Sequence, residues 1–159
     1  MRRRYAFFLV FLLFVFGGIY RIMYPYSAAG IQKGLEDMPH AILKNKQALL
    51  TIIEENAGQY IGQSDAMLRR FALYFPLPLC SVDLRNAKQV SFRLWDSVPE
   101  GSRYVYYCPE DRYQISSEKT ASPTDPEGRI VNLGINGEGY LYYKRMLPCW
   151  YYVESFLPT

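Results

Sequence analysis

Charged and uncharged positions divide the chain sharply near its start. Residues 5–20 carry no charge, and three arginines at positions 2–4 come directly before them. Extending the uncharged run to Tyr24 gives a helix of about 30 Å, which is enough to cross the hydrocarbon core of a bilayer. Arginines in front of such a run favour a cytoplasmic N-terminus. We therefore predict that residues 5–24 form a transmembrane helix, with the C-terminal domain outside the cytoplasm.

The flanks of this run support a retained signal-anchor and leave one alternative open. Arg21 can extend its guanidinium to the headgroups, Tyr24 suits the membrane interface, and Pro25 would end the helix. A secretory signal peptide has a similar pattern, and Ser27-Ala28-Ala29 would be its cleavage site. We expect a single-pass cell-membrane protein; the alternative is a protein secreted after cleavage.

This interpretation divides the chain into three parts. Residues 1–26 are the signal-anchor or transmembrane segment, residues 27–36 are a juxtamembrane segment, and residues 37–159 are one extracytoplasmic domain. The last part has the length of a single compact domain and can bury a core of its own.

The first half of this domain has the apolar spacing of helices. Apolar residues recur every three or four positions over 42–53, with charged residues between them. Asp37 is the predicted N-cap, which places Pro39 in the first turn, and Gly58 marks the end. A second, shorter helix is predicted to follow, with Ser64 as its N-cap.

The second half changes to the alternating pattern of half-buried strands. Asn136-Gly137 is the strongest hairpin signal in the chain, and residues 116–128 resemble a long exposed loop because they are rich in proline and hydroxyl side chains. The predicted strands are 90–95, 103–108, 113–115, 129–135, 140–146 and 149–156. The predicted fold class is α+β: an N-terminal transmembrane helix, then one or two helices packed on an antiparallel β-meander of four to six strands.

Tyrosines are concentrated on these predicted strands. Tyr142 and Tyr143 follow the hairpin, and Tyr151 and Tyr152 lie on the last strand. Neighbours on a strand point to opposite faces, so one tyrosine of each pair should be buried and the other exposed. An exposed tyrosine surface is typical of a binding site, whereas tyrosine is also common in strands for its propensity alone. We take these four residues as the candidate binding surface.

Candidate chemistry is otherwise sparse. Cys80, Cys108 and Cys149 fit no zinc spacing; in an oxidising compartment two of them could form a disulfide, and the sequence does not choose the pair or exclude three free thiols. His40 is the single histidine and lies in a predicted helix, so a Ser-His or Cys-His nucleophile has no support. We predict no catalytic residues, no metal ligands and no cofactor.

Charge excludes one further class of partner. Fourteen of the eighteen basic residues remain when the four around the uncharged run are removed, and they balance all fifteen acidic residues. Without a basic patch, nucleic-acid binding is not expected. The expected partners are the membrane, through residues 5–24, and a protein or cell-envelope ligand. The predicted function is a membrane-tethered binding module; the alternatives are an extracytoplasmic hydrolase that uses carboxylates and a structural subunit of a membrane complex.

Overall fold

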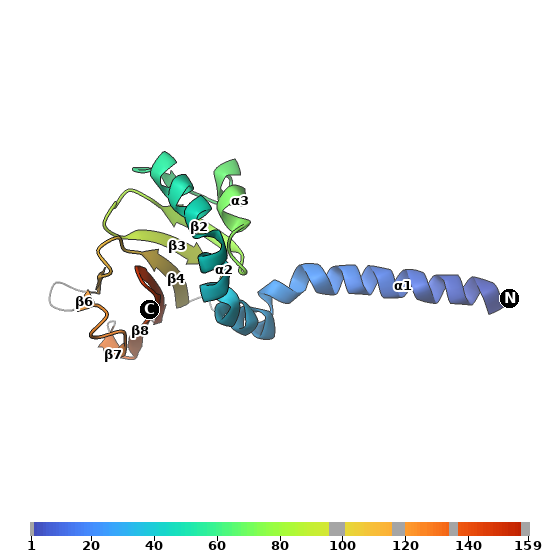
Figure 1. Ribbon diagram of the computed structural model, residues 1–159. Coiled ribbons are helices and arrows are strands. Elements are labelled where there is room, and N and C mark those ends of the chain that lie inside the picture. Colours follow the sequence, from blue (N-terminus) through green and yellow to red (C-terminus); the bar gives the residue numbers. More distant parts are fainter. Residues whose placement is uncertain (1, 96–100, 116–119, 134–136, 157–159) are drawn as a thin grey trace.

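The computed structural model describes residues 2–95, 101–115, 120–133 and 137–156, with side chains for all of these except 2–10 and 132. A long helix, α1 (Arg2–Met23), projects from a domain in which helices lie against a sheet (Figure 1). The described residues form three α-helices and one seven-stranded sheet. The fold class is therefore α+β, as predicted.

The helix α1 covers almost the whole of the expected membrane span. A short 3₁₀ turn, η1 (Tyr24–Tyr26), follows it and contains Pro25. Within the part of the chain that the structure describes, no helix is both long enough and apolar enough to cross a membrane. The span over residues 5–24 therefore stays a prediction from the sequence.

The second helix, α2 (Ala28–Glu55), begins earlier than predicted. Ser27 is its N-cap, and the hydroxyl oxygen of Ser27 accepts a hydrogen bond from the N–H of Gly30 at 3.1 Å. The N-cap predicted at Asp37 is therefore wrong: Asp37 lies in the interior of α2 and forms an i,i+4 ion pair with Lys33. The juxtamembrane residues form the first turns of this helix.

Pro39 lies inside α2 rather than in a first turn. A proline in a helix interior removes one hydrogen bond and costs about 3 kcal/mol. The neighbouring side chains of Met38 and Ile42 are fully buried in the main core. Their burial, worth roughly 1.5–3 kcal/mol each, is enough to hold the helix together through this position.

The remaining helix boundaries agree closely with the sequence pattern. α2 ends just before Gly58, which has a φ of 85°, so the predicted end is confirmed. The third helix, α3 (Ala66–Ala72), begins one residue later than predicted, because Asp65 rather than Ser64 caps it.

The main sheet has the strand order β1-β2-β3-β4-β9-β8-β7, and every strand pair is antiparallel. It is not a simple meander, because β4 pairs with β9 and so joins a first run of strands to a second. The strands of this sheet are β1 (Tyr60–Ile61), β2 (Leu79–Asp83), β3 (Val90–Leu94), β4 (Gly101–Tyr107), β7 (Glu127–Leu133), β8 (Gly139–Leu147) and β9 (Trp150–Phe156). A separate two-stranded sheet contains β5 (Tyr113–Gln114) and β6 (Thr120–Ala121).

Three of these strands were not predicted from the sequence. β2 directly follows Pro78, and its five residues show no clear alternation of apolar and polar side chains. β1 has only two residues, too few for a periodic signal. β6 lies within the predicted loop over 116–128, and β7 begins inside that range as well. The seven strands therefore exceed the four to six predicted.

The predicted hairpin joins β7 to β8, which pair in antiparallel register. Gly137 has a φ of 70°, as a type I′ turn requires. Asn136 lies outside the described residues.

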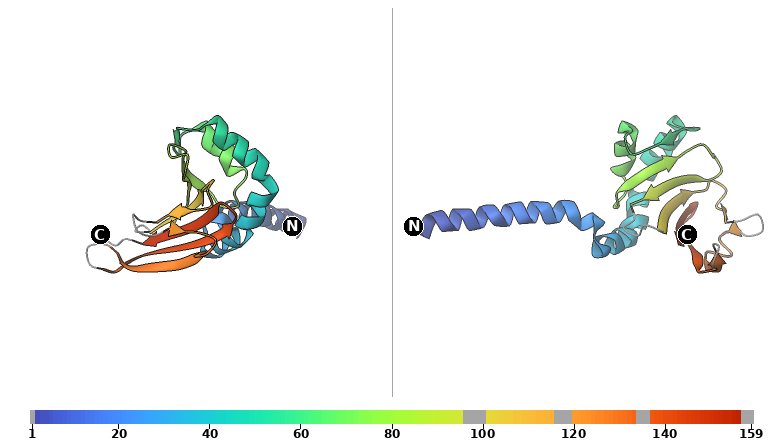
Figure 2. Two further views of the ribbon diagram at one scale, coloured as in Figure 1. Left: turned by 60° about the vertical axis from the view of Figure 1, so that its left-hand side comes forward. Right: turned by 180° about the vertical axis from the view of Figure 1, so that it is seen from behind.

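Two hydrophobic clusters stabilise the domain, one on each face of the sheet. Figure 2 shows that α2 and α3 lie on the same side of the sheet, where they cover the larger cluster. The smaller cluster lies on the opposite face, between β4, β8 and β9 and the small sheet β5–β6. It consists of Cys108, Tyr113, Ala121, Tyr143, Tyr151 and Val153.

Candidate functional site

The four candidate tyrosines lie on the neighbouring strands β8 and β9 and divide between the two faces of the sheet. Tyr152 belongs to the cluster beneath α2, and Tyr142 packs against the same cluster. Tyr143 and Tyr151 belong to the cluster beneath β5–β6. The predicted alternation of the two pairs is therefore confirmed.

Their exposure differs from the prediction on one strand. Tyr143 is 0% exposed and Tyr142 is half-buried. On β8, one tyrosine is therefore buried, as predicted, and its neighbour is the more exposed of the two. Tyr151 and Tyr152 are 0% and 8% exposed, so the expectation of one exposed member is wrong there. β9 lies between β4 and β8 and packs against a hydrophobic cluster on each face, which buries Tyr151 fully and leaves only a small part of Tyr152 accessible.

The tyrosine hydroxyls bind acceptors within the domain itself. A phenolic O–H that bonds an acceptor of its own domain is satisfied without water, so these hydrogen bonds hold the four rings in fixed positions. The hydrogen bonds run from Tyr142 to Glu127 (2.6 Å), from Tyr143 to Asp125 (2.9 Å), from Tyr151 to the backbone oxygen of Asp111 (2.6 Å) and from Tyr152 to Glu154 (2.7 Å).

Glu154 binds two tyrosine hydroxyls and one arginine. Its carboxylate accepts hydrogen bonds from Tyr140 at 2.6 Å, from Tyr152 at 2.7 Å and from Nε of Arg103 at 3.2 Å. Burial alone would raise the pKa of Glu154, but these three donors together lower it below its usual value. Glu154 is therefore held as a carboxylate beside the ring of Tyr152.

A groove of about 480 Å³ runs between α2 and the strands β8 and β9. Two of the candidate tyrosines, Tyr142 and Tyr152, line it. Burial, with a smaller effect of the Glu127 hydrogen bond, raises the pKa of Tyr142 to about 12. Burial also raises the pKa of Tyr152, so both hydroxyls stay protonated at physiological pH. The other lining residues are Gln32, Leu35, Glu36 and Pro39 from α2 and Lys144, Arg145, Met146 and Glu154 from the strands.

The proline in α2 changes the chemistry of this groove. Pro39 has no N–H, so the carbonyl of Leu35, four residues earlier, receives no hydrogen bond from position 39. Both residues line the groove. The α2 side of the groove therefore combines apolar side chains with a missing step in the helical hydrogen bonding.

The charged residues of the groove have different roles. Arg145 is committed to the domain, because Nε donates to Asp111 at 3.0 Å and a second nitrogen forms an ion pair with the same carboxylate. Lys144 and Glu36 are exposed; Lys144 lies 3.5 Å from Glu127, and Glu36 accepts a hydrogen bond from Gln32 at 3.1 Å. These two exposed charges of opposite sign are available to a ligand.

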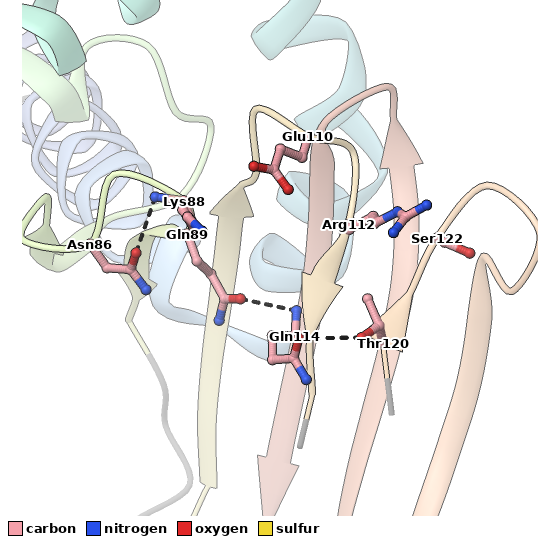
Figure 3. A pocket seen from close by; sticks show the side chains of 8 residues that line it. All are labelled: Asn86, Lys88, Gln89, Glu110, Arg112, Gln114, Thr120 and Ser122. Carbon is pink, nitrogen blue, oxygen red and sulfur yellow. Dashed lines mark hydrogen bonds between the residues drawn. The ribbon is translucent and has the colours of Figure 1, made fainter. Parts of the chain in front are cut away.

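A second hollow, of about 590 Å³, is polar and lies on the β5–β6 side (Figure 3). The N–H of Gln114 donates to the side-chain oxygen of Gln89 at 3.0 Å, which joins β5 to the loop before β3. Lys88, Glu110 and Arg112 also line it; all three are exposed and make no ion pair within the described residues. Exposed charges stay hydrated, so this hollow lacks the buried anchor of a tight binding site.

Sequence analysis did not identify either hollow. Their residues are single polar or apolar positions on elements far apart in the chain, and they meet only through the antiparallel register and the path of α2. The strand pattern pointed to Tyr142 and Tyr152, which line the groove, but the early proline of α2 was interpreted as a helix start.

The structure places two of the three cysteines side by side, and all three are free thiols. Cys108 and Cys149 extend the register of β4 and β9, and the N–H of Cys108 donates to the backbone oxygen of Cys149 at 2.8 Å. Burial raises the pKa of Cys108 to about 12. Cys80 lies on β2, in another part of the sheet.

The described residues offer little support for catalysis. They contain no group of three or more histidine, cysteine or acidic side chains that could hold a metal ion. The shifted carboxyl pKa values are all lowered, whereas a general acid needs a raised one. These carboxyls are Asp83, Asp111, Glu127 and Glu154.

Comparison with known proteins gives no assignment of this chain to a family. Neither a family model nor a curated protein nor a solved structure matches it. The function must therefore be inferred from the groove and from the sequence.

Proposed function

We propose that this protein is a single-pass membrane protein whose extracytoplasmic α+β domain binds a protein segment in the groove between α2 and β8–β9. The observation that supports this most is that two tyrosines expected to bind a ligand, Tyr142 and Tyr152, line one groove with the proline-interrupted part of α2.

The lining indicates the chemistry of the ligand. Leu35, Pro39, Met146 and the ring of Tyr142 offer apolar contact. The carbonyl of Leu35, which receives no hydrogen bond from position 39, would accept a backbone N–H of the ligand. A polypeptide supplies both an apolar side chain and N–H donors. The exposed charges at the rim, one acidic and one basic, suit a segment that carries both signs.

The anchor part of the proposal rests on the sequence. Three arginines come before an uncharged run, residues 5–20, and the run extended through Arg21 to Tyr24 reaches about 30 Å; this is the pattern of an N-in signal-anchor. It would hold the groove on the outer side of the membrane. A hydrolase is a weaker alternative, because the carboxylates with shifted pKa values are ion-paired or hydrogen-bonded and ionised.

A photo-crosslinking experiment on the full chain in native membranes tests the groove. A benzoylphenylalanine at Gln32 faces the groove, whereas the same residue at Lys33, also exposed and one position along α2, does not line it. We expect a polypeptide adduct from position 32 and none from position 33. Equal adducts at both positions, or an adduct that is a glycan, would contradict the proposed ligand.

Substitution of a groove tyrosine gives an independent test. Tyr142→Ser should remove most of the position-32 adduct, because the ring forms part of the apolar wall. Tyr60→Ser is the matched control, since Tyr60 is 56% exposed on β1 and lies outside the groove. An adduct that survives Tyr142→Ser undiminished would show that the tyrosine serves the fold alone.

A further inference from the structure

The junction between α1 and the domain contains no flexible linker. Ser27 is the one residue between η1 and α2, and its N–H and hydroxyl both donate to the backbone oxygen of Tyr24, at 3.0 and 2.7 Å. A Cβ on Gly30 would lie 1.8 Å from that same oxygen, so the first turn of α2 packs directly on η1. The domain therefore has a fixed orientation at the end of α1.

Aromatic side chains gather at this junction. The ring of Tyr26 meets the ring of Trp95 edge-on, with centroids 5.3 Å apart, although the two residues are distant in sequence. Both remain exposed, by 43% and 39%. Trp95 also donates its backbone N–H to Pro78 at 2.8 Å, which brings the segment between α3 and β2 to the same place.

The end of α3 carries apolar and basic groups on the same side of the domain. Figures 1 and 2 show α3 on the side of the domain from which α1 departs. Its last turn carries Arg69 and Arg70, both exposed and without an ion pair in the described part of the chain. Leu73, directly after the helix, is 80% exposed.

We infer that these five residues, Tyr26, Arg69, Arg70, Leu73 and Trp95, form a lipid-contact face that lies on the headgroups of the leaflet where α1 ends. The inference rests on the proposed membrane anchor. Tryptophan and tyrosine prefer the membrane interface, where the ring is partly apolar and its polar tip stays hydrated. Arginines near the surface attract anionic headgroups. Because Ser27 and Gly30 pack directly on η1, an inserted α1 holds this side of the domain toward the bilayer.

Fluorescence quenching of the full-length protein in vesicles tests the contact. Wild type and Trp95→Phe are reconstituted in phosphatidylcholine with bromine near the top of the acyl chains, and the difference between their emissions reports Trp95. We expect at least about twofold quenching of Trp95, as for a ring at the interface. Trp150, 1% exposed in the core, remains in Trp95→Phe and should stay unquenched.

Charge reversal tests the basic part of the face. In vesicles that also contain phosphatidylserine, Arg69→Glu with Arg70→Glu should reduce the quenching of Trp95. Lys44→Glu with Lys46→Glu makes the same change of charge on exposed positions farther along α2 and should leave the quenching unchanged. Equal effects of the two double variants would overturn the role of the arginines.

A carbonate wash separates the two proposals. Protein that resists the wash but shows unquenched Trp95 would overturn the lipid-contact face and leave the anchor standing. Protein that is lost in the wash would overturn the anchor, and the lipid-contact face with it. Circular dichroism and a melting curve for each variant confirm that the domain is folded in every comparison.

Discussion

Asp111 shows how one residue can hold several strands of this domain in place. It sits in the turn after β4 with a φ of 54° and accepts hydrogen bonds from Arg145 on β8 and from the N–H of Cys149 at 2.7 Å. The hydroxyl of Tyr151 on β9 also donates to it, at 3.1 Å. These donors, the Arg145 hydrogen bond first, lower the pKa of Asp111.

Replacing Asp111 by asparagine should therefore give a pH-dependent loss of stability. The pKa of the Asp111 carboxyl is lower in the folded state than in the unfolded state, where it is near 3.8. Its ionised form therefore stabilises the fold at pH values above the unfolded pKa, and this stabilisation is lost as the pH falls through the folded pKa. We expect Asp111→Asn to cost about 1–3 kcal/mol at pH 7, measured by urea unfolding. The gap between wild type and variant should narrow below about pH 4. A gap that is equally wide at pH 3 would contradict this role.

Cys149 is held in a backbone conformation that favours glycine. Its φ is 70°, in the tight turn between β8 and β9. This region costs a residue with a side chain roughly 1–2 kcal/mol, and glycine loses about 0.5–1 kcal/mol in chain entropy. Under reducing conditions we expect Cys149→Gly to gain about 0.5–1 kcal/mol of unfolding free energy by the difference. Cys149→Ala keeps the strained backbone and should show no gain; a gain in both variants would refute the explanation.

At the scale of elements, α2 is the part of the fold that the sequence predicted least well. The alternation of strand residues is a local pattern, so the opposite faces of Tyr142 and Tyr143 could be predicted from it. Helix continuity at Pro39 depends instead on the burial of Met38 and Ile42 against distant strands. The burial of Tyr152 likewise depends on β4 pairing with β9, which no local signal reveals. Both wrong predictions therefore concern contacts between residues that are far apart in the sequence.

Pro39→Ala tests the balance within α2. Alanine restores the hydrogen bond to the carbonyl of Leu35 and should stabilise the domain by about 1–3 kcal/mol in chemical denaturation. The restored N–H also occupies the groove's backbone acceptor, so ligand capture at position 32 should weaken. His40→Ala, at the exposed neighbouring position, is the control and should change neither. A Pro39→Ala protein without added stability would mean that the helix is already broken there.

The register of β4 and β9 predicts which cysteines an oxidant joins. Directly opposed residues of an antiparallel pair have Cα atoms about 4.5–5.5 Å apart, within the range that a disulfide spans. We expect a small-molecule disulfide to oxidise Cys108 and Cys149 to a disulfide bond. The number of free thiols, counted by alkylation and a mobility shift on a gel, should then fall by two in wild type and in Cys80→Ser. Cys108→Ser should keep both remaining thiols. Bridging that involves Cys80 would show that the register is misassigned.

For the whole molecule, the distribution of charge predicts its orientation in the membrane. The arginines at positions 2–4 precede the uncharged run, and the domain after it is close to neutral. An alkaline phosphatase fused to the C-terminus should be active, because that enzyme requires an oxidising compartment. Reversing the three arginines to glutamates should lower the activity, since the positive charges orient the helix. Full activity of a cytoplasmic reporter at the same position would contradict the topology.

The close packing of Tyr24 against Gly30 also limits where the domain can travel. A domain on a flexible tether explores a hemisphere whose radius grows with the square root of linker length. Ser27 alone separates η1 from α2, so no such linker is present. With α1 in a bilayer, the groove would stay at one height above the membrane and at one tilt relative to α1. It would move only by rotation about α1 and by lateral diffusion. Partner proteins anchored in the same membrane would reach the groove by lateral diffusion, at the fixed height of the groove above the bilayer. Substituting a bulky residue for Gly30 would therefore alter which neighbours the groove can reach while leaving its lining unchanged.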